Sequence, residues 1–302
     1  MKLNDLENFS KKIDGKIFFN LNIQKFNWFN IGGEVKVFFK PNNLKELTEF
    51  LKLYGKRGKI FILGAGSNVL FKDDTYQGVV IKLGNNFSNI SALNNNTIIA
   101  GSSCTQKKLS EFAKNNSLGG LEFMSCIPGT IGGGIRMNSG CFGSEFKDLL
   151  VSIQIMDFYG NIKSIPANKI VFNYRETDLS KNIIFLSGTF RGQKKNKTEI
   201  EKMMIELKTR KDIAQPTKIK TGGSTFKNPK EKTDKKVWEL IKANTPKKIN
   251  FGDACISEKH ANFFVNKNNA NFSDMKSLID FVKEKVKIKT GIELNLEIVI
   301  VD

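Results

Sequence analysis

The chain has 302 residues and a formal charge of +18, from 48 lysines and arginines against 30 acidic residues. Hydrophobic residues make up 40% and charged residues 26%, which is typical of a folded globular protein and excludes a largely disordered one. No segment has the roughly 18 to 20 apolar residues that a membrane-spanning helix needs, and residues 1–16 lack the apolar core of a signal peptide. The sequence therefore predicts a cytoplasmic protein of two or three domains, without membrane insertion.

The positive charge could indicate a polyanionic partner such as nucleic acid. The lysines are spread along the whole chain, however, which favours a general compositional bias, and we expect no nucleic-acid partner. A basic nucleic-acid-binding protein is the non-enzyme alternative. The four cysteines form no C-x-x-C pair and His260 is the only histidine, so we expect no metal site.

Residues 1–84 alternate between helical and strand-like patterns. Apolar residues at helical spacing over 44–54 end at Gly55, and the apolar run 60–63 follows as a buried strand. A second strand is expected over 79–83. These elements predict a small α/β domain at the start of the chain.

Residues 85–195 favour a second, strand-rich domain. A strand from Ile98 precedes a helix over 105–117, with Leu109 facing inward, and Gly119 is expected to end that helix. Three further strands are predicted over 153–157, 162–165 and 183–187.

A polar segment near residue 195 separates this domain from a third one, residues 196–302. Its first helix, over 198–211, carries an apolar stripe of four residues: Ile200, Met203, Met204 and Leu207. In its last helix, over 273–289, four apolar residues are expected to face inward: Leu278, Ile279, Val282 and Val286. In the final strand, over 293–302, four alternating residues form one apolar face: Leu294, Leu296, Ile298 and Ile300.

Two glycine-rich loops carry the strongest functional signal. The first, within 61–71, places glycines directly after a strand, where backbone N–H groups could surround a phosphate. The dinucleotide fingerprint would need a third glycine at Val69 and a following amphipathic helix, and both are missing. A plain tight turn is an equally good interpretation of this loop alone.

The second loop, over 125–143, combines dense glycine with apolar residues such as Ile127 and Ile131. Those apolar residues do not suit a solvated linker, so the pattern favours a loop that wraps a bulky ligand. Together the two loops predict a large, phosphate-bearing cofactor held between the first two domains.

Six motifs follow one another over nearly the whole chain: ILGAGSNVL (62–70), IPGTIGGGIRMNSG (127–140), YRET (174–177), GGSTFKNP (222–229), SEKHANFFVN (257–266) and LNLEIVIVD (294–302). In this order they closely resemble the UDP-N-acetylenolpyruvoylglucosamine reductase (MurB) family. The resemblance implies an α+β fold: a two-subdomain FAD-binding module, with a small α/β unit and a strand-rich unit, followed by an α/β substrate-binding domain.

The resemblance also implies an activity. NADPH would reduce a non-covalently bound FAD, and hydride would pass to the enolpyruvyl group of a UDP-sugar substrate, giving UDP-N-acetylmuramate. Such an enzyme serves peptidoglycan synthesis, cell wall biogenesis, cell shape and cell division, and we expect it to be a monomer. Another FAD oxidoreductase of the same cofactor-binding fold, with a different substrate, is the alternative.

The family's first loop lies along the FAD pyrophosphate, and its second wraps the flavin. Carried over by motif, the implied cofactor contacts are Gly64, Ala65, Gly66, Ser67, Asn68, Ser125, Ile127, Pro128, Gly129, Thr130, Gly133, Asn138 and Gly140.

Three residues match the family's catalytic positions. Arg175 suits the stabilisation of negative charge on the substrate carboxylate, because a guanidinium is always cationic and can donate two parallel hydrogen bonds. Ser224 would donate a proton to carbon, and Glu297 would orient the intermediate or relay the proton. By spacing alone the three would be a surface arginine, a hydroxyl-capped turn and an exposed glutamate. We expect all three to converge beside the flavin, with substrate contacts from Tyr174, Lys227 and Asn228.

Some positions depart from the family's pattern. Cys126 stands where a glycine is usual, Thr177 replaces a serine, and residues 27–35 lack a threonine that commonly precedes the double glycine. The connection 189–221 has room for one helix only, so the chain resembles the shorter subtype, which lacks an extra tyrosine-bearing loop.

Overall fold

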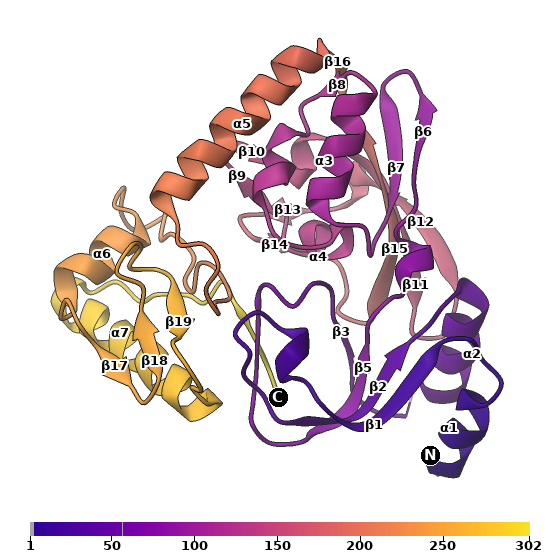
Figure 1. The fold of residues 1–302 in the computed structure, drawn as a ribbon, viewed down its shortest axis with the longest axis horizontal. Coiled ribbons are helices and arrows are strands. Elements are labelled where there is room, and N and C mark those ends of the chain that lie inside the picture. Colours follow the sequence, from indigo (N-terminus) through magenta and orange to yellow (C-terminus); the bar gives the residue numbers. More distant parts are fainter. Residues whose placement is uncertain (1–2, 56) are drawn as a thin grey trace. The chain divides into compact units, whose positions relative to one another are not determined.

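The computed structural model describes residues 3–55 and 57–302 (Figure 1). The chain forms two compact units, each assembled from separate segments. The first unit contains Met1–Phe19, Lys36–Ala65 and Gln77–Arg210, and the second contains Asn20–Val35, Gly66–Tyr76 and Lys211–Asp302. The mixed helix and sheet content predicted from the sequence is confirmed. The three-domain division at 84/85 and 195/196 stays a prediction.

A four-stranded sheet lies largely in the first unit. Its strands, in spatial order, are β1 (Lys16–Asn22), β2 (Glu34–Lys40), β5 (Tyr76–Ile81) and β3 (Ile60–Ile62). Two helices belong to the same region: α1 (Leu3–Ser10) and α2 (Leu44–Tyr54). The Asn43 side chain accepts the Glu46 N–H at 3.0 Å and begins α2 where the sequence predicts it. The strand predicted over 79–83 begins and ends earlier, as β5 at Tyr76–Ile81.

Helix α2 packs on this sheet through aromatic and aliphatic side chains. Phe50 stacks on Phe39 of β2 with ring centroids 4.3 Å apart, and both side chains are fully buried. Met156 and Ile184, from later in the chain, belong to the same apolar cluster. The cores of the first two predicted domains are therefore joined within one unit.

A five-stranded antiparallel sheet forms the rest of the first unit. Its strands, in spatial order, are β12 (Ile162–Pro166), β11 (Leu150–Asp157), β15 (Ile183–Arg191), β7 (Thr97–Gly101) and β6 (Ile90–Asn94). The strands predicted from Ile98 and over 153–157, 162–165 and 183–187 are confirmed.

Helix α3 (Gln106–Asn115) ends earlier than predicted. Its last turn is capped at Asn116, and Ser117 takes the left-handed conformation at φ 56°. The expected stop, Gly119, lies instead in the short strand β8 (Leu118–Gly119), which pairs with β16 (Gln193–Lys194). The prediction was wrong because polar residues before the glycine already reverse the chain.

Helix α5 (Lys197–Ala214) follows the strand-rich region and buries a narrower stripe than predicted. Ile200, Met204 and Leu207 are buried at i, i+4 and i+7, whereas Met203 is 41% exposed. Met203 lies at the edge of the stripe, where it lines a surface pocket. Its predicted inward position was therefore wrong.

In the second unit, α7 (Phe272–Thr290) packs on a small antiparallel sheet, and α6 (Val237–Asn244) packs on α7. The strands are β17 (Asn250–Phe251), β18 (Ala254–Ile256) and β19 (Phe264–Asn266). Asn271 and Asp274 form a capping box at the start of α7, and Gly291 ends it at φ 71°. The four residues predicted to face inward from α7 are buried.

The end of the chain is less regular than predicted. Only β20 (Val299–Val301) is a regular strand, and it pairs in parallel with β4 (Val69–Phe71). Leu294 and Ile298 are buried as expected, but Val301 rather than Ile300 is the next buried residue. The alternation fails because residues before Val299 pair with a different partner, the segment after Ser224.

Among the described residues, no helix is long and apolar enough to cross a membrane. In the same part of the chain, no group of three or more histidine, cysteine, aspartate or glutamate side chains is placed to hold a metal ion.

Candidate active site

The second glycine loop is packed onto the first unit by backbone hydrogen bonds. Ile131 and Gly132 donate their N–H groups to the carbonyls of Cys104 and Ser102, at 2.8 and 2.9 Å. Thr130 caps the short helix α4 (Ile131–Arg136) by accepting the Gly133 N–H at 3.3 Å. Helix α4 in turn packs on β7 and β15. The loop is thus part of the folded unit, as the apolar residues within it predict.

The two predicted glycine loops meet in the first unit. A Cβ atom added to Gly64 would lie 2.7 Å from Oγ1 of Thr130, closer than two such atoms approach in proteins. The Lys82 ammonium donates to the Gly64 carbonyl oxygen in the first loop. Burial lowers the pKa of Lys82, with Lys40 contributing. A cation therefore lies against the loop that is predicted to bind the pyrophosphate. No motif in the sequence marks Lys82.

Within the second unit, the end of the first glycine loop is bound to the last segment of the chain. Asn68 donates from Nδ2 to the Glu297 carbonyl at 3.0 Å, and its own carbonyl accepts the Val299 N–H at 2.9 Å. These residues are more than 200 positions apart in the sequence. A predicted cofactor residue and a predicted catalytic residue are thus neighbours.

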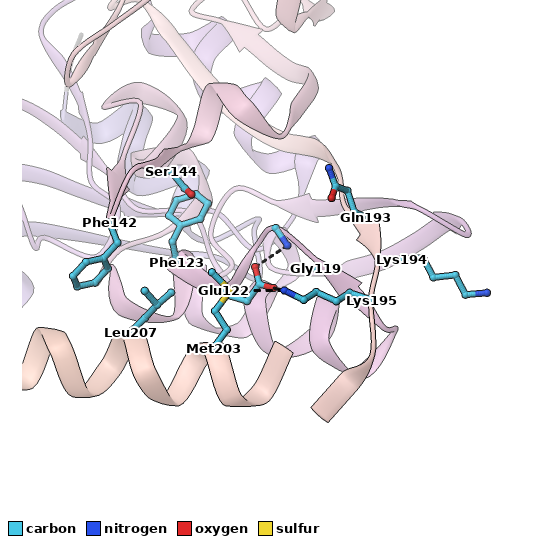
Figure 2. A pocket seen from close by; sticks show the side chains of 11 residues that line it. Gly119, Glu122, Phe123, Phe142, Ser144, Gln193, Lys194, Lys195, Met203 and Leu207 are labelled. Atoms are coloured by element: carbon cyan, nitrogen blue, oxygen red, sulfur yellow. Dashed lines mark hydrogen bonds and ion pairs between the residues drawn. The ribbon is translucent and has the colours of Figure 1, made fainter. Parts of the chain in front are cut away.

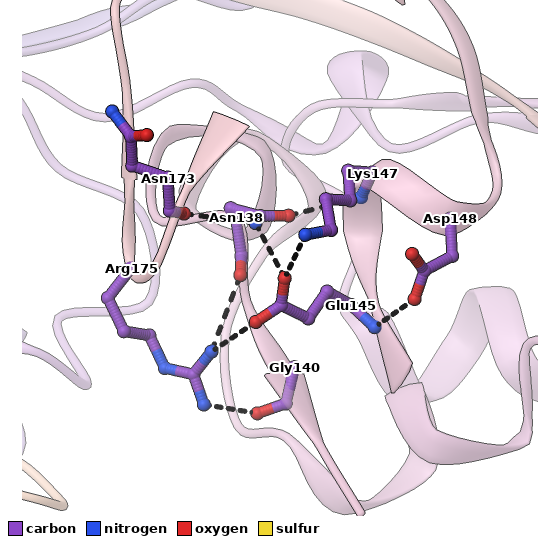
Figure 3. Close-up of polar contacts among 7 residues, drawn as sticks. All are labelled: Asn138, Gly140, Glu145, Lys147, Asp148, Asn173 and Arg175. Carbon is purple, nitrogen blue, oxygen red and sulfur yellow. Dashed lines mark hydrogen bonds and ion pairs between the residues drawn. The ribbon is translucent and has the colours of Figure 1, made fainter. Parts of the chain in front are cut away.

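Arg175 occupies a tight turn in the first unit (Figure 3). It follows β13 (Phe172–Asn173) and precedes β14 (Glu176–Thr177), and its backbone is left-handed at φ 59°. This conformation is unfavourable for a side chain that is not glycine, and such positions concentrate at functional sites. The guanidinium lies 4.9 Å from the Tyr174 ring centroid, a cation–π contact.

The Arg175 guanidinium is held by the second glycine loop. Nη2 donates to the Gly140 carbonyl at 2.5 Å, and Nη1 lies 3.5 Å from the Asn138 carbonyl and 3.6 Å from Oε1 of Glu145 (Figure 3). The Glu145 carboxylate also accepts from the Asn138 amide at 3.0 Å and pairs with Lys147 at 3.1 Å. Arg175 is therefore oriented from two sides, with one-sixth of its side chain exposed.

Glu145 is a further residue of this cluster, and no motif in the sequence marks it. It lies in β10 (Ser144–Glu145), which pairs with β9 (Gly140–Cys141) and so folds back beside the loop. The only signal in the sequence is that a carboxylate follows the last glycine of the loop within a few residues. Its meeting with Arg175, thirty positions later, depends on the fold.

Ser224 and Glu297 come from neighbouring segments of the second unit. The Thr225 carbonyl accepts the Glu297 N–H at 2.8 Å, and Phe226 pairs with Leu296 in antiparallel fashion. Both Ser224 and Glu297 are half-buried. Arg175 belongs to the first unit, so the convergence of all three residues stays a prediction.

Other predicted site residues have structural contacts of their own. The Asn228 side chain accepts the N–H of Val237, the first residue of α6, at 2.9 Å. Ser125 donates from Oγ to the Glu122 carbonyl at 2.7 Å. Asn138 is fully buried and organises the Arg175 cluster through its amide. Cys126, the departure from the family's glycine, packs into the apolar core at 6% exposure. Direct contacts of the predicted residues with cofactor and substrate stay predictions.

A pocket of about 320 Å³ lies elsewhere on the first unit, between α5 and the short helix Glu122–Cys126 (Figure 2). The buried Glu122 carboxylate accepts the Gly120 N–H at 2.7 Å and lies 3.9 Å from the Lys195 ammonium. Its apolar lining comes from Phe123, Phe142, Met203 and Leu207. None of the predicted site residues is among the described residues that line it.

Comparison with known proteins gives the family. Residues 35–165 match the FAD binding domain family, and residues 215–301 match the C-terminal domain of UDP-N-acetylenolpyruvoylglucosamine reductase. The UDP-N-acetylenolpyruvoylglucosamine reductase of Pelagibacter ubique is 60% identical over 298 residues, 99% of each chain. That of Rickettsia bellii is 41% identical over 286 residues, 95% of this chain and 94% of the relative.

A solved structure shares the fold. The crystal structure of UDP-N-acetylenolpyruvylglucosamine reductase from Thermus caldophilus superposes with a TM-score of 0.82 at 25% identity, over 96% of this chain and all of that one. The predicted fold class, an FAD-binding module followed by a C-terminal domain, is confirmed. The six motifs, the two glycine loops and the full-length identity agree, and the chain belongs to the UDP-N-acetylenolpyruvoylglucosamine reductase family of FAD-binding oxidoreductases.

Proposed function

We propose that this protein reduces UDP-N-acetylglucosamine enolpyruvate to UDP-N-acetylmuramate, with FAD as cofactor and NADPH as hydride donor. The observation that carries the proposal is the 60% identity with a reductase of that name over 99% of both chains. The reaction belongs to peptidoglycan precursor synthesis, and through it to cell wall biogenesis, cell shape and cell division.

We place the reaction in the cytoplasm, because a nucleotide sugar and a reduced nicotinamide dinucleotide are its substrates. We also propose that the protein acts as a monomer, because a single chain contributes Arg175, Ser224 and Glu297 together with both glycine loops.

The residues present fit FAD. Gly64 leaves room beside Thr130 that a Cβ would fill, and Gly66 has the left-handed φ of 72° that favours glycine. Backbone N–H groups of residues 64–68 would bind the pyrophosphate, next to the charge of Lys82, and residues 125–140 would surround the flavin. When bound, FAD would accept a hydride from NADPH and supply it to the enolpyruvyl double bond.

Arg175 would stabilise the charge that hydride addition pushes into the substrate carboxylate. The Gly140 carbonyl, the Asn138 carbonyl and Glu145 hold its guanidinium before substrate arrives, so little reorganisation is needed in the transition state. The Tyr174 ring supports the same group and would exclude water from one side of it.

Ser224 would donate the proton to the adjoining carbon of the substrate. The two glycines before it allow the backbone to approach the substrate closely, and Gly223 is left-handed at φ 78°. Glu297, on the segment paired with Thr225, would return a proton to the serine oxygen or orient the intermediate.

The test is the flavin spectrum of the purified protein, recorded before NADPH, after NADPH, and after addition of the enolpyruvyl nucleotide. We expect a yellow protein whose flavin is bleached by NADPH and reoxidised by the nucleotide, with UDP-N-acetylmuramate as product. A flavin that NADPH reduces but the nucleotide does not reoxidise would show that the substrate is wrong. A colourless protein that binds DNA with steep salt dependence would support the nucleic-acid alternative.

Ser224→Ala separates the two half-reactions. NADPH should reduce its flavin at the normal rate, while product formation should fall by on the order of 10² to 10⁴, the usual contribution of a positioned general acid. Stopped-flow absorbance measures both steps. Loss of both would assign Ser224 to folding or cofactor binding.

A further inference from the structure

The motif SEKHANFFVN (257–266) has no role in the chemistry described so far, yet one of its residues binds the segment that carries Ser224. Asn262 is 2% exposed. Its carbonyl accepts the Thr225 N–H at 2.8 Å, its Oδ1 accepts the Phe226 N–H at 3.0 Å, and its Nδ2 donates to the Phe226 carbonyl at 2.9 Å. One asparagine thus supplies three hydrogen bonds to the two residues directly after Ser224.

Before Ser224, the side-chain hydrogen bond nearest to it comes from Thr221, whose Oγ1 donates to the Phe264 carbonyl at 2.7 Å. Gly222 and Gly223 have no side chains, and a Cβ on Gly223 would meet no atom within 4 Å. Among the described residues, the buried Thr225 Oγ1 has no hydrogen-bond partner, so the Thr225 side chain does not fix the segment through a hydrogen bond either. Ser224 itself pairs with Phe263, and directly after it the side-chain hydrogen bonds to the segment come from Asn262.

The buried Phe226 side chain anchors this segment in the apolar core, but it does not fix which residues lie opposite each other. It is fully buried and meets Phe264 edge to face, with ring centroids 5.7 Å apart. Apolar contacts are not directional, whereas hydrogen bonds between segments decide which residues lie opposite each other. Asn262 binds both backbone polar groups of Phe226 and so prevents the segment from sliding.

The opposite edge of the segment is bound to the Glu297 strand. The Thr225 N–H donates to the Asn262 carbonyl on one side, and the Thr225 carbonyl accepts the Glu297 N–H on the other, at 2.8 Å in each case. A shift of residues 225–226 would therefore move Ser224 relative to Glu297. The Asn262 N–H, in turn, donates to Nδ1 of His260 at 3.2 Å, which braces the turn that holds the asparagine.

We propose that Asn262 is a positioning residue for the proton-transfer step: its side-chain amide holds Ser224 in register with Glu297. The inference rests on the proposed function, in which Ser224 protonates the substrate. A displacement of about 1 Å at a reacting group can cost on the order of 10²-fold in rate. Loss of the amide should therefore slow the step that uses Ser224 and leave flavin reduction by NADPH unchanged.

Asn266 provides a matched control in the same motif. It is also 2% exposed, and its side chain makes three backbone hydrogen bonds: Nδ2 donates to the carbonyls of Phe29 at 2.9 Å and Asn30 at 3.5 Å, and Oδ1 accepts the Ala270 N–H at 2.8 Å. Those partners are not attached to Ser224. Asn266→Ala thus removes an equally buried amide that makes no hydrogen bond to residues 224–226.

The experiment compares Asn262→Ala and Asn266→Ala with the unchanged flavin-loaded protein by stopped flow. For Asn262→Ala we expect reoxidation by the enolpyruvyl nucleotide to slow by about 10- to 100-fold, with NADPH reduction within about two-fold of normal. Asn266→Ala should lower the unfolding midpoint but keep both rates per flavin-loaded molecule. The solvent deuterium effect on reoxidation should increase in Asn262→Ala alone, because proton transfer becomes rate-limiting.

If the alanine variant loses its flavin, Asn262→Gln replaces it in the same measurement. Glutamine keeps the amide oxygen and nitrogen but displaces them by one methylene. Normal reoxidation in either folded variant, or equal slowing in Asn266→Ala, would overturn the proposal. So would failure of both Asn262 variants to retain flavin, since the residue would then be needed for the fold as a whole. Failure of the unchanged protein to be reoxidised would instead overturn the proposed function.

Discussion

The Arg175 guanidinium is held in one orientation by its neighbours. Carbonyl oxygens of Asn138 and Gly140 and the Glu145 carboxylate surround it, and its backbone is kept in a left-handed conformation. An arginine arranged in this way presents a planar fork, which a lysine ammonium cannot reproduce.

Arg175→Lys should therefore lose product formation while keeping its positive charge. We expect a fall of on the order of 10² to 10³ in the reoxidation rate, comparable with the removal of one preorganised donor, and little change in NADPH reduction. Lys147→Met is the control, because Lys147 pairs with the same Glu145 carboxylate from a more exposed position. Equal effects of the two variants would mean that the whole cluster is structural.

His260 makes the stability of the second unit sensitive to mild acid. Burial lowers its pKa below the ordinary value of 6.5, so the folded protein binds fewer protons at this site than the unfolded chain. Above pH 6.5 the imidazole is neutral in both states, and the free energy of unfolding does not depend on its titration. As the pH falls from 6.5 toward the folded-state pKa, the unfolded chain binds the proton first, so the free energy of unfolding decreases.

Urea unfolding at pH 7.5 and at pH 5.5 measures this contribution. The unchanged protein should lose more stability between these two pH values than His260→Gln, which has no imidazole to protonate. Because His260 is the only histidine, the difference between the two proteins belongs to this residue alone. An equal loss in both proteins would contradict the assignment.

At the scale of the elements, two left-handed glycines with nearly the same φ stand in different surroundings. Gly66, in the first glycine loop, has φ 72°, and a Cβ there would overlap the Phe26 carbonyl oxygen. Gly291, at the end of α7, has φ 71°, and a Cβ there would meet no atom within 4 Å. Alanine at Gly291 would therefore meet only the strain of the left-handed backbone, whereas alanine at Gly66 would also overlap a neighbouring atom.

Gly291→Ala should lower the free energy of unfolding by about 1 kcal/mol, the cost of the left-handed conformation alone. Gly66→Ala adds the overlap, so we expect a loss of more than about 2 kcal/mol together with a loss of bound flavin. Denaturant unfolding and the flavin absorbance of the purified variants measure both effects. Flavin retention in Gly66→Ala would contradict the role of the first loop.

For the whole molecule, bound FAD should contribute to stability, because the folded chain binds it and the unfolded chain does not. At a free concentration of 100 times Kd, the contribution is about 2.7 kcal/mol. The unfolding midpoint of the flavin-stripped protein should therefore rise with added FAD, and that of Gly66→Ala should not. A midpoint that does not depend on FAD in the unchanged protein would exclude binding by this chain.

The sequence by itself determined the local elements and the identity of the family. Helical spacing placed α2 and α7, strand patterns placed most of the five-stranded sheet, and glycine density marked both loops. These signals are local, because hydrophobic period, caps and glycine conformations depend on residues a few positions apart. The exceptions, such as the early end of α3, arose where another polar residue reversed the chain first.

Only the tertiary structure decided what surrounds the predicted catalytic residues. Glu145 beside Arg175, Asn68 on Glu297 and Asn262 beside the Ser224 segment join residues that lie from 30 to more than 200 positions apart. Their hydrogen bonds depend on the path of the chain and on which strand edges meet, and no local pattern records either. The sequence therefore identifies the groups that react, whereas the fold alone determines the partners that orient them.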